Sequence, residues 1–374
     1  MVCKGTKKQE KAKHFYLVIS EEYTNFAPYN ISIILHNMKI VSFGEALLRF
    51  SKQDNMRLSQ GNSMEAHFGG SEANGAVSLS ILGNEVRYVT RLPNNTLGQS
   101  CVQRLREMGL DTRFVCWGGD RIGTYYFEQA ASLRPPRIVY DRKGSAFYTL
   151  QPGMIPWRKV FEGMDVFCCS GITCAVSQTA ADATFEAVQI ADEMGLTIAC
   201  DINYRKNLWN YGVRAAEVLP RLMSHASVIF GDAGEWELAS GLPRIPFEAQ
   251  RSDYPIDIDT YTSMFRQIAE QYPRCQKFIL GLRNEISTNH HLLSGVLYNR
   301  ERLFTAKIYD INPVIDPMGV GDAYLAAYLH AYLQRHDDDQ HCLYFSLAAS
   351  ALKSTIVGDF NLSTEEEVLA LLGQ

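Results

Sequence analysis

The sequence has no apolar run long enough to cross a membrane. The longest candidate near its start, Phe15–Ser20, is followed at once by Glu21 and Glu22, whereas a bilayer-spanning helix needs about 20 apolar residues. Residues 1–37 also lack the apolar core of a signal peptide. These absences predict a cytoplasmic protein without a membrane partner.

An excess of positive charge is missing as well. The formal net charge is −5 and the pI is near 6.0, so the chain has no basic field of the kind that attracts nucleic acid or anionic membranes. We therefore expect a small-molecule partner and no nucleic acid.

The cysteines lack the regular spacing of a disulfide framework or a zinc site. There are nine of them, an odd number, and Cys168, Cys169 and Cys174 lie in an apolar run and at its exit. We expect these three to be buried, reduced thiols.

What the chain does have is enough apolar sequence for a large core. Of its 374 residues, 46% are hydrophobic and 21% are charged, which predicts one large domain with a smaller piece attached. Met38 precedes a clean apolar strand, Lys39–Gly44, while residues 1–37 show no such pattern. We interpret residues 1–37 as an N-terminal extension outside the fold and residues 38–374 as the domain.

After this strand, short apolar runs alternate with helical segments, as in proteins built on a parallel sheet. Expected helices end at glycines, which supply left-handed caps. No repeat or low-complexity linker is visible, and the stretch 241–258, rich in Pro, Asp and Arg, reads as a surface loop. The expected helices are Ser71–Leu82, Leu97–Met108, Ser177–Met194, Ala233–Ser240, Tyr261–Tyr272, 321–335 and 341–356. The expected strands are Glu85–Thr90, Asp165–Ser170, Leu196–Asp201, Ser227–Phe230, Lys277–Leu282, His291–Tyr298 and Arg302–Tyr309.

The segment 111–150 interrupts the alternation. Its runs Phe114–Trp117, Gly123–Phe127 and Arg137–Tyr140 read as strands with no helix between them. We predict a small β-lid assembled from about 45–60 and 111–148.

The sharpest motif is Asp316-Pro-Met-Gly-Val-Gly-Asp322, which leads directly into an apolar helix. Glycines at 319 and 321 allow a tight turn whose N–H groups, together with the helix N-terminus, suit a phosphate oxyanion. Asp322 would then accept the proton of an attacking hydroxyl. The plainer alternative is that Asp322 only caps the helix.

This motif and a second one, His67-Phe-Gly-Gly-Ser-Glu-Ala-Asn-Gly-Ala76, resemble two signatures of the ribokinase-like carbohydrate kinases, the PfkB family. The family's closing signature is Asp-Thr-x-Gly-Ala-Gly-Asp, so Pro317 and Val320 are variants here. The resemblance covers roughly 39–370. It implies an α/β, ribokinase-like fold with a central, mainly parallel sheet flanked by helices, and a kinase that uses ATP and Mg²⁺. The residues implied in catalysis are Asp322 as base with Gly319, Val320 and Gly321, and those implied in sugar binding are Gly69, Gly70 and Asn74.

Within the family, the likeness is greatest to 2-keto-3-deoxygluconate kinases. It rests on Gly123-Thr-Tyr-Tyr, Tyr140-Asp-Arg-Lys-Gly-Ser-Ala146 and Asp201-Ile-Asn-Tyr-Arg-Lys-Asn-Leu-Trp209. The substrate would be a sugar acid, 2-keto-3-deoxygluconate, phosphorylated to its 6-phosphate. Its carboxylate suits a guanidinium fork. The implied contacts are Tyr125, Tyr140, Arg142 and Arg205, and Gly44-Glu45 is also expected to face the sugar.

On the nucleotide side, Asp232-Ala-Gly-Glu235 takes the place of the family's Asn-x-x-Glu element, which implies that Glu235 helps to organise Mg²⁺. The segment 279–287 departs from the family's glycine-containing ATP loop, since Arg283 and Ile286 stand at the expected glycines. We expect this segment still to wrap ATP through Arg283. The remaining residues expected to bind the nucleotide are Asp232, Ala348, Ser350 and Gly358.

Three alternatives stay open at this level. The first is the same chemistry on fructose or another neutral sugar, and the second is a non-catalytic sugar sensor on the same scaffold, suggested by the altered ATP segment. A nucleotide-dependent dehydrogenase is the most distant, because Gly-x-Gly-x-x-Gly is absent after the first strand. In related kinases β-lids pair between subunits, so the resemblance also implies a homodimer or a higher homo-oligomer.

Overall fold

The computed structural model describes residues 38–335 and 338–373. Its main sheet has the strand order β14-β13-β12-β11-β10-β9-β1-β4, with β15 paired to β13. The strands from β4 to β12 are parallel and the rest run antiparallel, so the predicted central, mainly parallel sheet is confirmed. The strands are β1 (Lys39–Phe43), β4 (Glu85–Val89), β9 (Val166–Ser170), β10 (Thr197–Asp201), β11 (Val228–Asp232), β12 (Lys277–Ser287), β13 (His290–Tyr298), β14 (Leu303–Thr305) and β15 (Tyr309–Ile311).

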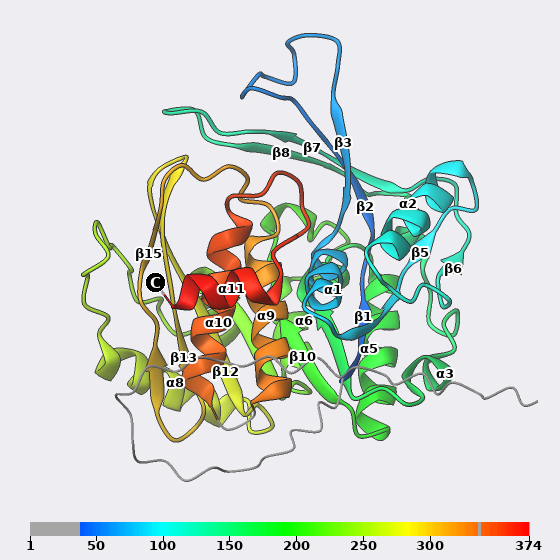
Figure 1. The fold of residues 1–374 in the computed structure, drawn as a ribbon. Coiled ribbons are helices and arrows are strands. Elements are labelled where there is room, and N and C mark those ends of the chain that lie inside the picture. Colours follow the sequence, from blue (N-terminus) through cyan, green and yellow to red (C-terminus); the bar gives the residue numbers. More distant parts are fainter. Residues whose placement is uncertain (1–37, 336–337, 374) are drawn as a thin grey trace, which may run out of the picture. The chain divides into compact units, whose positions relative to one another are not determined.

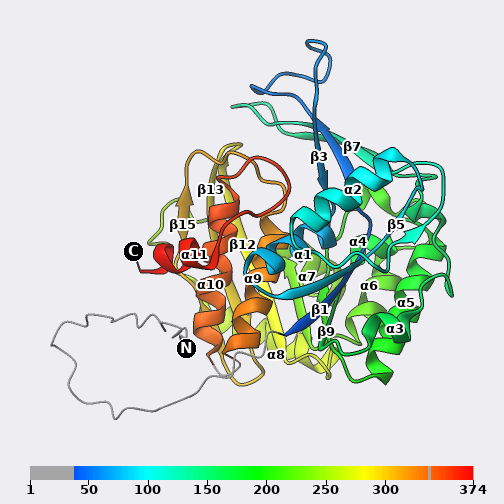
Figure 2. The same ribbon diagram turned by 45° about the vertical axis from the view of Figure 1, so that its right-hand side comes forward.

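Side chains that alternate along these strands pack into two separate hydrophobic cores, one on each face of the sheet. In β9, Val166 and Cys168 join one cluster and Phe167 and Cys169 the other, because successive strand residues point to opposite faces. Helices cover both faces (Figures 1 and 2). One face carries α1 (Ser71–Ile81), α2 (Thr96–Glu107), α9 (Val320–Gln334), α10 (Asp339–Lys353) and α11 (Glu365–Leu372); the other carries α3 (Trp157–Phe161), α4 (Gly171–Cys174), α5 (Gln178–Glu193), α6 (Ala215–Met223), α7 (Ala233–Ser240) and α8 (Ile258–Gln271). Two 3₁₀ turns, η1 (Phe147–Thr149) and η2 (Lys206–Leu208), complete these elements.

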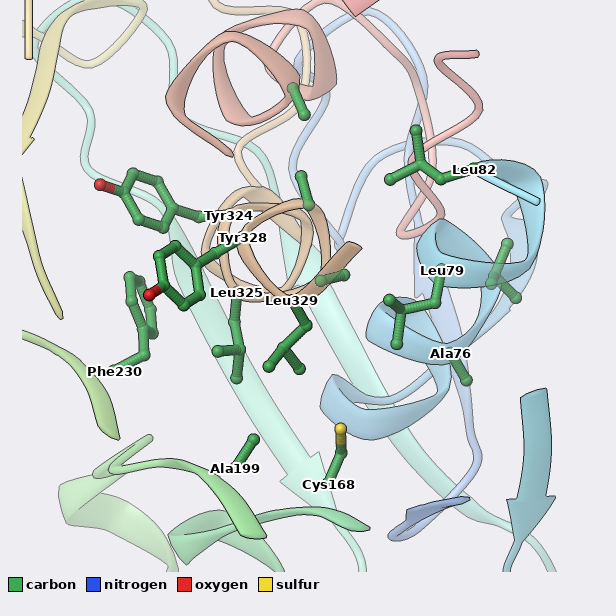
Figure 3. Packing of buried hydrophobic residues seen from close by; sticks show 14 of the residues in the cluster. Ala76, Leu79, Leu82, Cys168, Ala199, Phe230, Tyr324, Leu325, Tyr328 and Leu329 are labelled. Atoms are coloured by element: carbon green, nitrogen blue, oxygen red, sulfur yellow. The ribbon is translucent and has the colours of Figure 1, made fainter. Parts of the chain in front are cut away.

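Helices α1 and α9 lie side by side on the sheet. Leu325 and Leu329 of α9 point toward Cys168 and Ala199 in the strands below (Figure 3). Each fully buried aliphatic side chain of this kind stabilises the fold by about 1.5–3 kcal/mol. The packing brings the first turns of the two helices together at one end of the sheet, where the chain leaves β1.

A second sheet, the lid, projects from that end (Figure 1). Its strand order is β3-β2-β7-β8. The pairs β2–β3 and β7–β8 are antiparallel and β2–β7 is parallel. Its strands are β2 (Leu47–Ser51), β3 (Glu65–Gly69), β7 (Gly123–Glu128) and β8 (Arg137–Asp141).

The lid differs from the predicted one in its members. The run Phe114–Trp117 contributes only β6 (Cys116–Trp117), which pairs with β5 (Arg91–Leu92) in a separate two-stranded sheet. Val115 is buried in the main core, and this anchors the run away from the lid. The lid's first half extends to Gly69, because β3 pairs along the whole of β2.

Sequence patterns missed α6, which contains Pro220 in its interior, and the short helices α3, α4 and α11. None of the helices in the described part is long and apolar enough to span a membrane. Residues 1–37 lie outside the described residues, so their assignment as an extension stays a prediction.

Candidate active site

The turn that starts α9 is built from the motif 316–322. Gly319 adopts φ 80° at the helix N-cap, and a Cβ there would lie 2.1 Å from the Asp359 carbonyl oxygen, so only glycine fits. Asp316 Oδ1 accepts the Met318 N–H at 3.0 Å and shapes the turn. The first amides of α9 have no partner within the helix, and they create an anion-binding point of positive potential.

Asp322 lies in the first turn of α9 and faces α1. Its two carboxylate oxygens accept hydrogen bonds from Ser71 Oγ at 2.6 Å and Asn74 Nδ2 at 2.8 Å. Burial raises the pKa of Asp322 above its ordinary value, although these two hydrogen bonds and the charges of Arg205 and Lys353 act in the opposite direction. The carboxylate is therefore held in one orientation beside the anion-binding turn.

Sequence reasoning missed the support behind this carboxylate. Asn203 Nδ2 donates to Ser71 Oγ and to Asp201 Oδ2, and Asp201 ends β10. Burial, with the Glu235 and Asp322 carboxylates, raises the pKa of Asp201. The signal was available, because Asp201 and Asn203 precede Arg205 in the segment that suggested a sugar-acid kinase, but only Arg205 was assigned.

A cavity of about 30 Å³ lies behind Asp322. Its lining includes Glu72, Ser170 and Asp201, and it has room for a water molecule. Ser170 and Thr173 donate to Glu72 Oε1. Burial raises the pKa of Glu72. Its side chain bonds Ser170 and Thr173, so it is a buried neighbour of Asp322 that is held by other partners.

The predicted substrate residues divide into two groups. In the first group, Asn74 bonds Asp322, and Gly69 and Gly70 are buried just before α1. A Cβ on Gly70 would meet the Glu45 carbonyl oxygen at 2.2 Å. Asn74 Oδ1 and Asn203 Oδ1 are buried without a hydrogen-bond partner in the described structure. Unpaired buried polar atoms are costly, so this end of the sheet offers acceptors to a ligand's hydroxyl groups.

Arg142 follows the lid strand β8 and is 5% exposed. Its Nε donates to Glu45 Oε2 at 2.5 Å, and Ser145 donates to the other oxygen of Glu45. Arg142 Nη1 is buried and has no partner among the described residues. Glu45 thus anchors the Nε side of Arg142, while Nη1 remains buried and unpaired among the described residues.

Arg205 approaches from the main sheet. Its Nη1 donates to Glu235 Oε1 at 3.2 Å, and its side chain is 44% exposed. Partial burial lowers its pKa, but Glu235, Tyr140, Asp201 and Asp322 raise it overall. The charges of Asp322 and of the lid's Tyr140 therefore both act on Arg205, whose direct partner is Glu235.

Tyr125 already has a protein partner for its hydroxyl, and its role as a substrate contact stays a prediction. Its hydroxyl donates to Asp359 at 2.8 and 2.9 Å, and the side chain is buried at 7% exposure. Because Asp359 occupies the hydroxyl, Tyr125 is a packing partner of Tyr140, at 6.2 Å between ring centroids, while Tyr140 keeps a half-exposed position.

Glu235 forms a capping box with Asp232 at the start of α7. Oε2 accepts the Asp232 N–H at 2.9 Å and Oε1 accepts the Tyr204 N–H at 2.8 Å. Burial and the charge of Asp232 raise the pKa of Glu235 to about 7. Both oxygens are therefore committed to protein donors.

Two of the predicted nucleotide residues lie under the anion-binding turn. Ser350 Oγ donates to the Val320 carbonyl at 3.0 Å, and the Gly358 N–H donates to Asp316 Oδ2 at 3.0 Å. Gly358 also lines a groove of about 310 Å³ with His67 and Asp359.

The structure places Ala348 and Arg283 differently from what we expected, and the nucleotide roles of these residues and of Asp232 stay predictions. Ala348 is fully buried in the core. Residues 279–287 belong to β12, which pairs with β13 as far as Ser287, and Arg283 pairs with Glu285 on its exposed face. Without the glycines, these residues continue the strand instead of forming a loop.

The comparisons with known proteins agree with this geometry. The sequence pattern described as pfkB family carbohydrate kinase matches residues 37–254. The chain is 29% identical over 335 residues to 2-dehydro-3-deoxygalactonokinase of Haloferax volcanii, covering 89% of this chain and 96% of that protein. The crystal structure of 2-dehydro-3-deoxygluconokinase from Thermotoga maritima has a TM-score of 0.82 and 31% identity, covering 91% of this chain and 99% of the other. A putative ribokinase II from E. coli, at 19% identity, shares the fold with a TM-score of 0.74, covering 90% of this chain and 99% of that one. The chain therefore belongs to the pfkB family of carbohydrate kinases.

Proposed function

We propose that this kinase transfers the γ-phosphoryl group of ATP to a hydroxyl of a sugar acid, 2-keto-3-deoxygluconate, giving the 6-phosphate. The observation that carries the choice of an acid is Arg142 Nη1, which is buried and unpaired beside the sugar-binding end of the sheet. Arg205 provides a second guanidinium from the opposite side. Two of the similar proteins are named for 2-dehydro-3-deoxy sugar acids.

In the proposed mechanism, Asp322 accepts the proton of the attacking hydroxyl while the amides of Gly319–Gly321 take up charge on the moving phosphoryl group. Ser71 and Asn74 hold the carboxylate in place. The lid covers the sugar and excludes water that would otherwise hydrolyse ATP.

Mg²⁺ would supply positive charge to the triphosphate. The described residues contain no group of three or more His, Cys, Asp or Glu placed to hold a metal. We propose that Glu235 orients a Mg²⁺-bound water rather than binding the ion, because both its oxygens already accept protein hydrogen bonds.

The substrate is tested by a coupled assay with ATP across 2-keto-3-deoxygluconate, 2-keto-3-deoxygalactonate, gluconate, fructose and ribose. We expect the highest kcat/KM on a 2-keto-3-deoxy sugar acid. A preference for fructose would contradict the acid assignment and favour the neutral-sugar alternative. The homo-oligomer and the cytoplasmic location stay predictions of the sequence.

The pH dependence tests the base. Asp322 acts deprotonated and its pKa is raised, so kcat/KM should fall, as the pH is lowered, at a pH above the ordinary range of an aspartate. Ser71→Ala removes a hydrogen bond that lowers this pKa. The acid limb should then move to higher pH.

Ser100→Ala is the matched control, because Ser100 donates only to the Thr96 carbonyl in α2. It should leave the pH profile unchanged. If Ser71→Ala left the limb in place or moved it to lower pH, another group would be the base.

A further inference from the structure

Arg49 is a buried arginine in a lid strand, and it bridges two carboxylates that lie outside the lid. Its Nη2 lies 2.8 Å from Asp316 Oδ2 and its Nη1 lies 3.0 Å from Asp359 Oδ1. The Arg49 side chain is only 2% exposed, and the guanidinium packs over the Phe127 ring at 5.6 Å. The fork geometry of a guanidinium suits such a double contact.

Both carboxylate residues support the turn at the start of α9. Asp316 accepts the Met318 N–H through Oδ1 and the Gly358 N–H through Oδ2. The Asp359 carbonyl oxygen is packed against Gly319 so closely that no Cβ fits. Arg49 is therefore connected, through Asp316 and Asp359, to the backbone that carries the Gly319–Gly321 amides.

The lid makes a second contact with the same place. Tyr125 of β7 donates its hydroxyl to both oxygens of Asp359. In Figures 1 and 2, the loop between α10 and α11, which carries Asp359, reaches toward the lid strands. We call Arg49, Tyr125, Asp316 and Asp359 the lid–turn cluster.

A second cation, the fully buried Lys353 of α10, interacts electrostatically with Asp316 and Asp359 of this cluster. Its Nζ donates to the Ile356 carbonyl at 2.9 Å and lies 3.5 Å from the Asp316 carbonyl. Burial lowers the pKa of Lys353 to about 8 and raises that of Asp359 to about 6, although the charges of Asp316 and Arg49, respectively, oppose these shifts. Two cations thus face two carboxylates with little water between them.

A buried ion cluster of this kind is a poor source of stability, because well-packed apolar side chains often serve as well. Its geometric effect is larger, since it fixes the lid and the turn to each other through directional bonds. We propose that Arg49 is a positioning residue for phosphoryl transfer, which couples the lid to the Gly319–Gly321 turn so that the amides are correctly placed only when the lid is seated. This inference rests on the proposed role of that turn as the anion hole.

The test is Arg49→Lys, which keeps the positive charge but loses the fork that reaches both carboxylates. Small misplacements of this kind cost up to about 100-fold in rate. We expect kcat to fall by about 10- to 100-fold while the KM for the sugar changes by less than about threefold, because Arg49 does not contact the proposed sugar site. Rates are corrected for the folded fraction from the melting curve.

Arg87→Lys is the matched control. Arg87 is also buried, bonds Asp111 through Nε at 3.1 Å and packs over Phe114, but it lies outside the proposed active site. We expect it to lower the Tm with kcat within about threefold of wild type. The inference is overturned if Arg49→Lys keeps wild-type kcat, or if both variants lose kcat equally.

If Arg49→Lys does not fold, Tyr125→Phe carries the test, because it removes only the hydroxyl that bonds Asp359. A reduced kcat with unchanged sugar KM supports the coupling, and an unchanged kcat overturns it. All variants are compared on the acceptor that wild type prefers, so the comparison remains readable whichever sugar that is. Failure of the base assignment would instead appear in Asp322→Asn.

Discussion

Asp322→Asn should keep the fold and lose about 10²- to 10⁴-fold in kcat, as expected when a general base is removed. The side chains have the same shape, and an amide oxygen can still accept from Ser71 Oγ or Asn74 Nδ2, which now hold the carboxylate. A larger loss is also compatible, because the carboxylate positions the hydroxyl as well. The measurement is kcat with saturating ATP and sugar, alongside the Tm and calorimetric binding of the sugar.

Glu72→Gln provides the control for this loss. Glu72 is a buried carboxylate that lines the same small cavity, and a glutamine keeps an acceptor for Ser170 and Thr173. We expect its kcat to stay within a few-fold of wild type. Near-normal turnover in folded Asp322→Asn would mean that Asp322 is not the base and that its carboxylate only links α9 to Ser71 and Asn74 of α1.

The strand–helix order was predictable because local patterns determine it. Residues 233–240 form the expected helix, and the first strand has its predicted start at Lys39. Local signals also explain the failures. Pro220 in the interior of α6 made that segment read as non-helical. Arg283 and Ile286 stand where the family has glycines, and the expected loop there is a continuation of strand β12.

The turn at 316–322 was predictable for the same reason, since its glycines, its amides and Asp322 are contiguous. The lid–turn cluster was not, because Arg49 contacts residues 267 and 310 positions away. In sequence, Arg49 is one residue of the stretch 45–60 that is expected in the lid, and no local pattern marks its partners. Only the fold shows that this side chain is buried against Asp316 and Asp359, and that Tyr125 bonds the same Asp359.

Arg142 and Arg205 should separate acidic from neutral substrates. A charge-assisted hydrogen bond to a carboxylate is worth about 1.5–3 kcal/mol, or roughly ten- to a hundredfold in kcat/KM. Losing either guanidinium should therefore reduce kcat/KM on 2-keto-3-deoxygluconate by that factor. Activity on fructose, which has no carboxylate, should fall much less.

The structure decides which substitutions to use. Arg142→Ala would leave Glu45 as a buried, unpaired carboxylate, which costs about 3–5 kcal/mol of stability. Arg142→Lys keeps a cation beside Glu45 and removes the free Nη1. At the half-exposed Arg205, alanine is suitable, because its partner Glu235 retains the Tyr204 and Asp232 amides.

Arg214→Ala is the matched control, since Arg214 forms an exposed pair with Glu217, with its side chain 82% exposed. Such pairs contribute about 0–1 kcal/mol and do not distinguish substrates. The measurement is kcat/KM of all three variants on 2-keto-3-deoxygluconate and on fructose. Equal losses on both sugars in Arg142→Lys and Arg205→Ala would remove the sugar-acid assignment, whereas the kinase activity and the roles proposed for Asp322 and the α9 turn would stand.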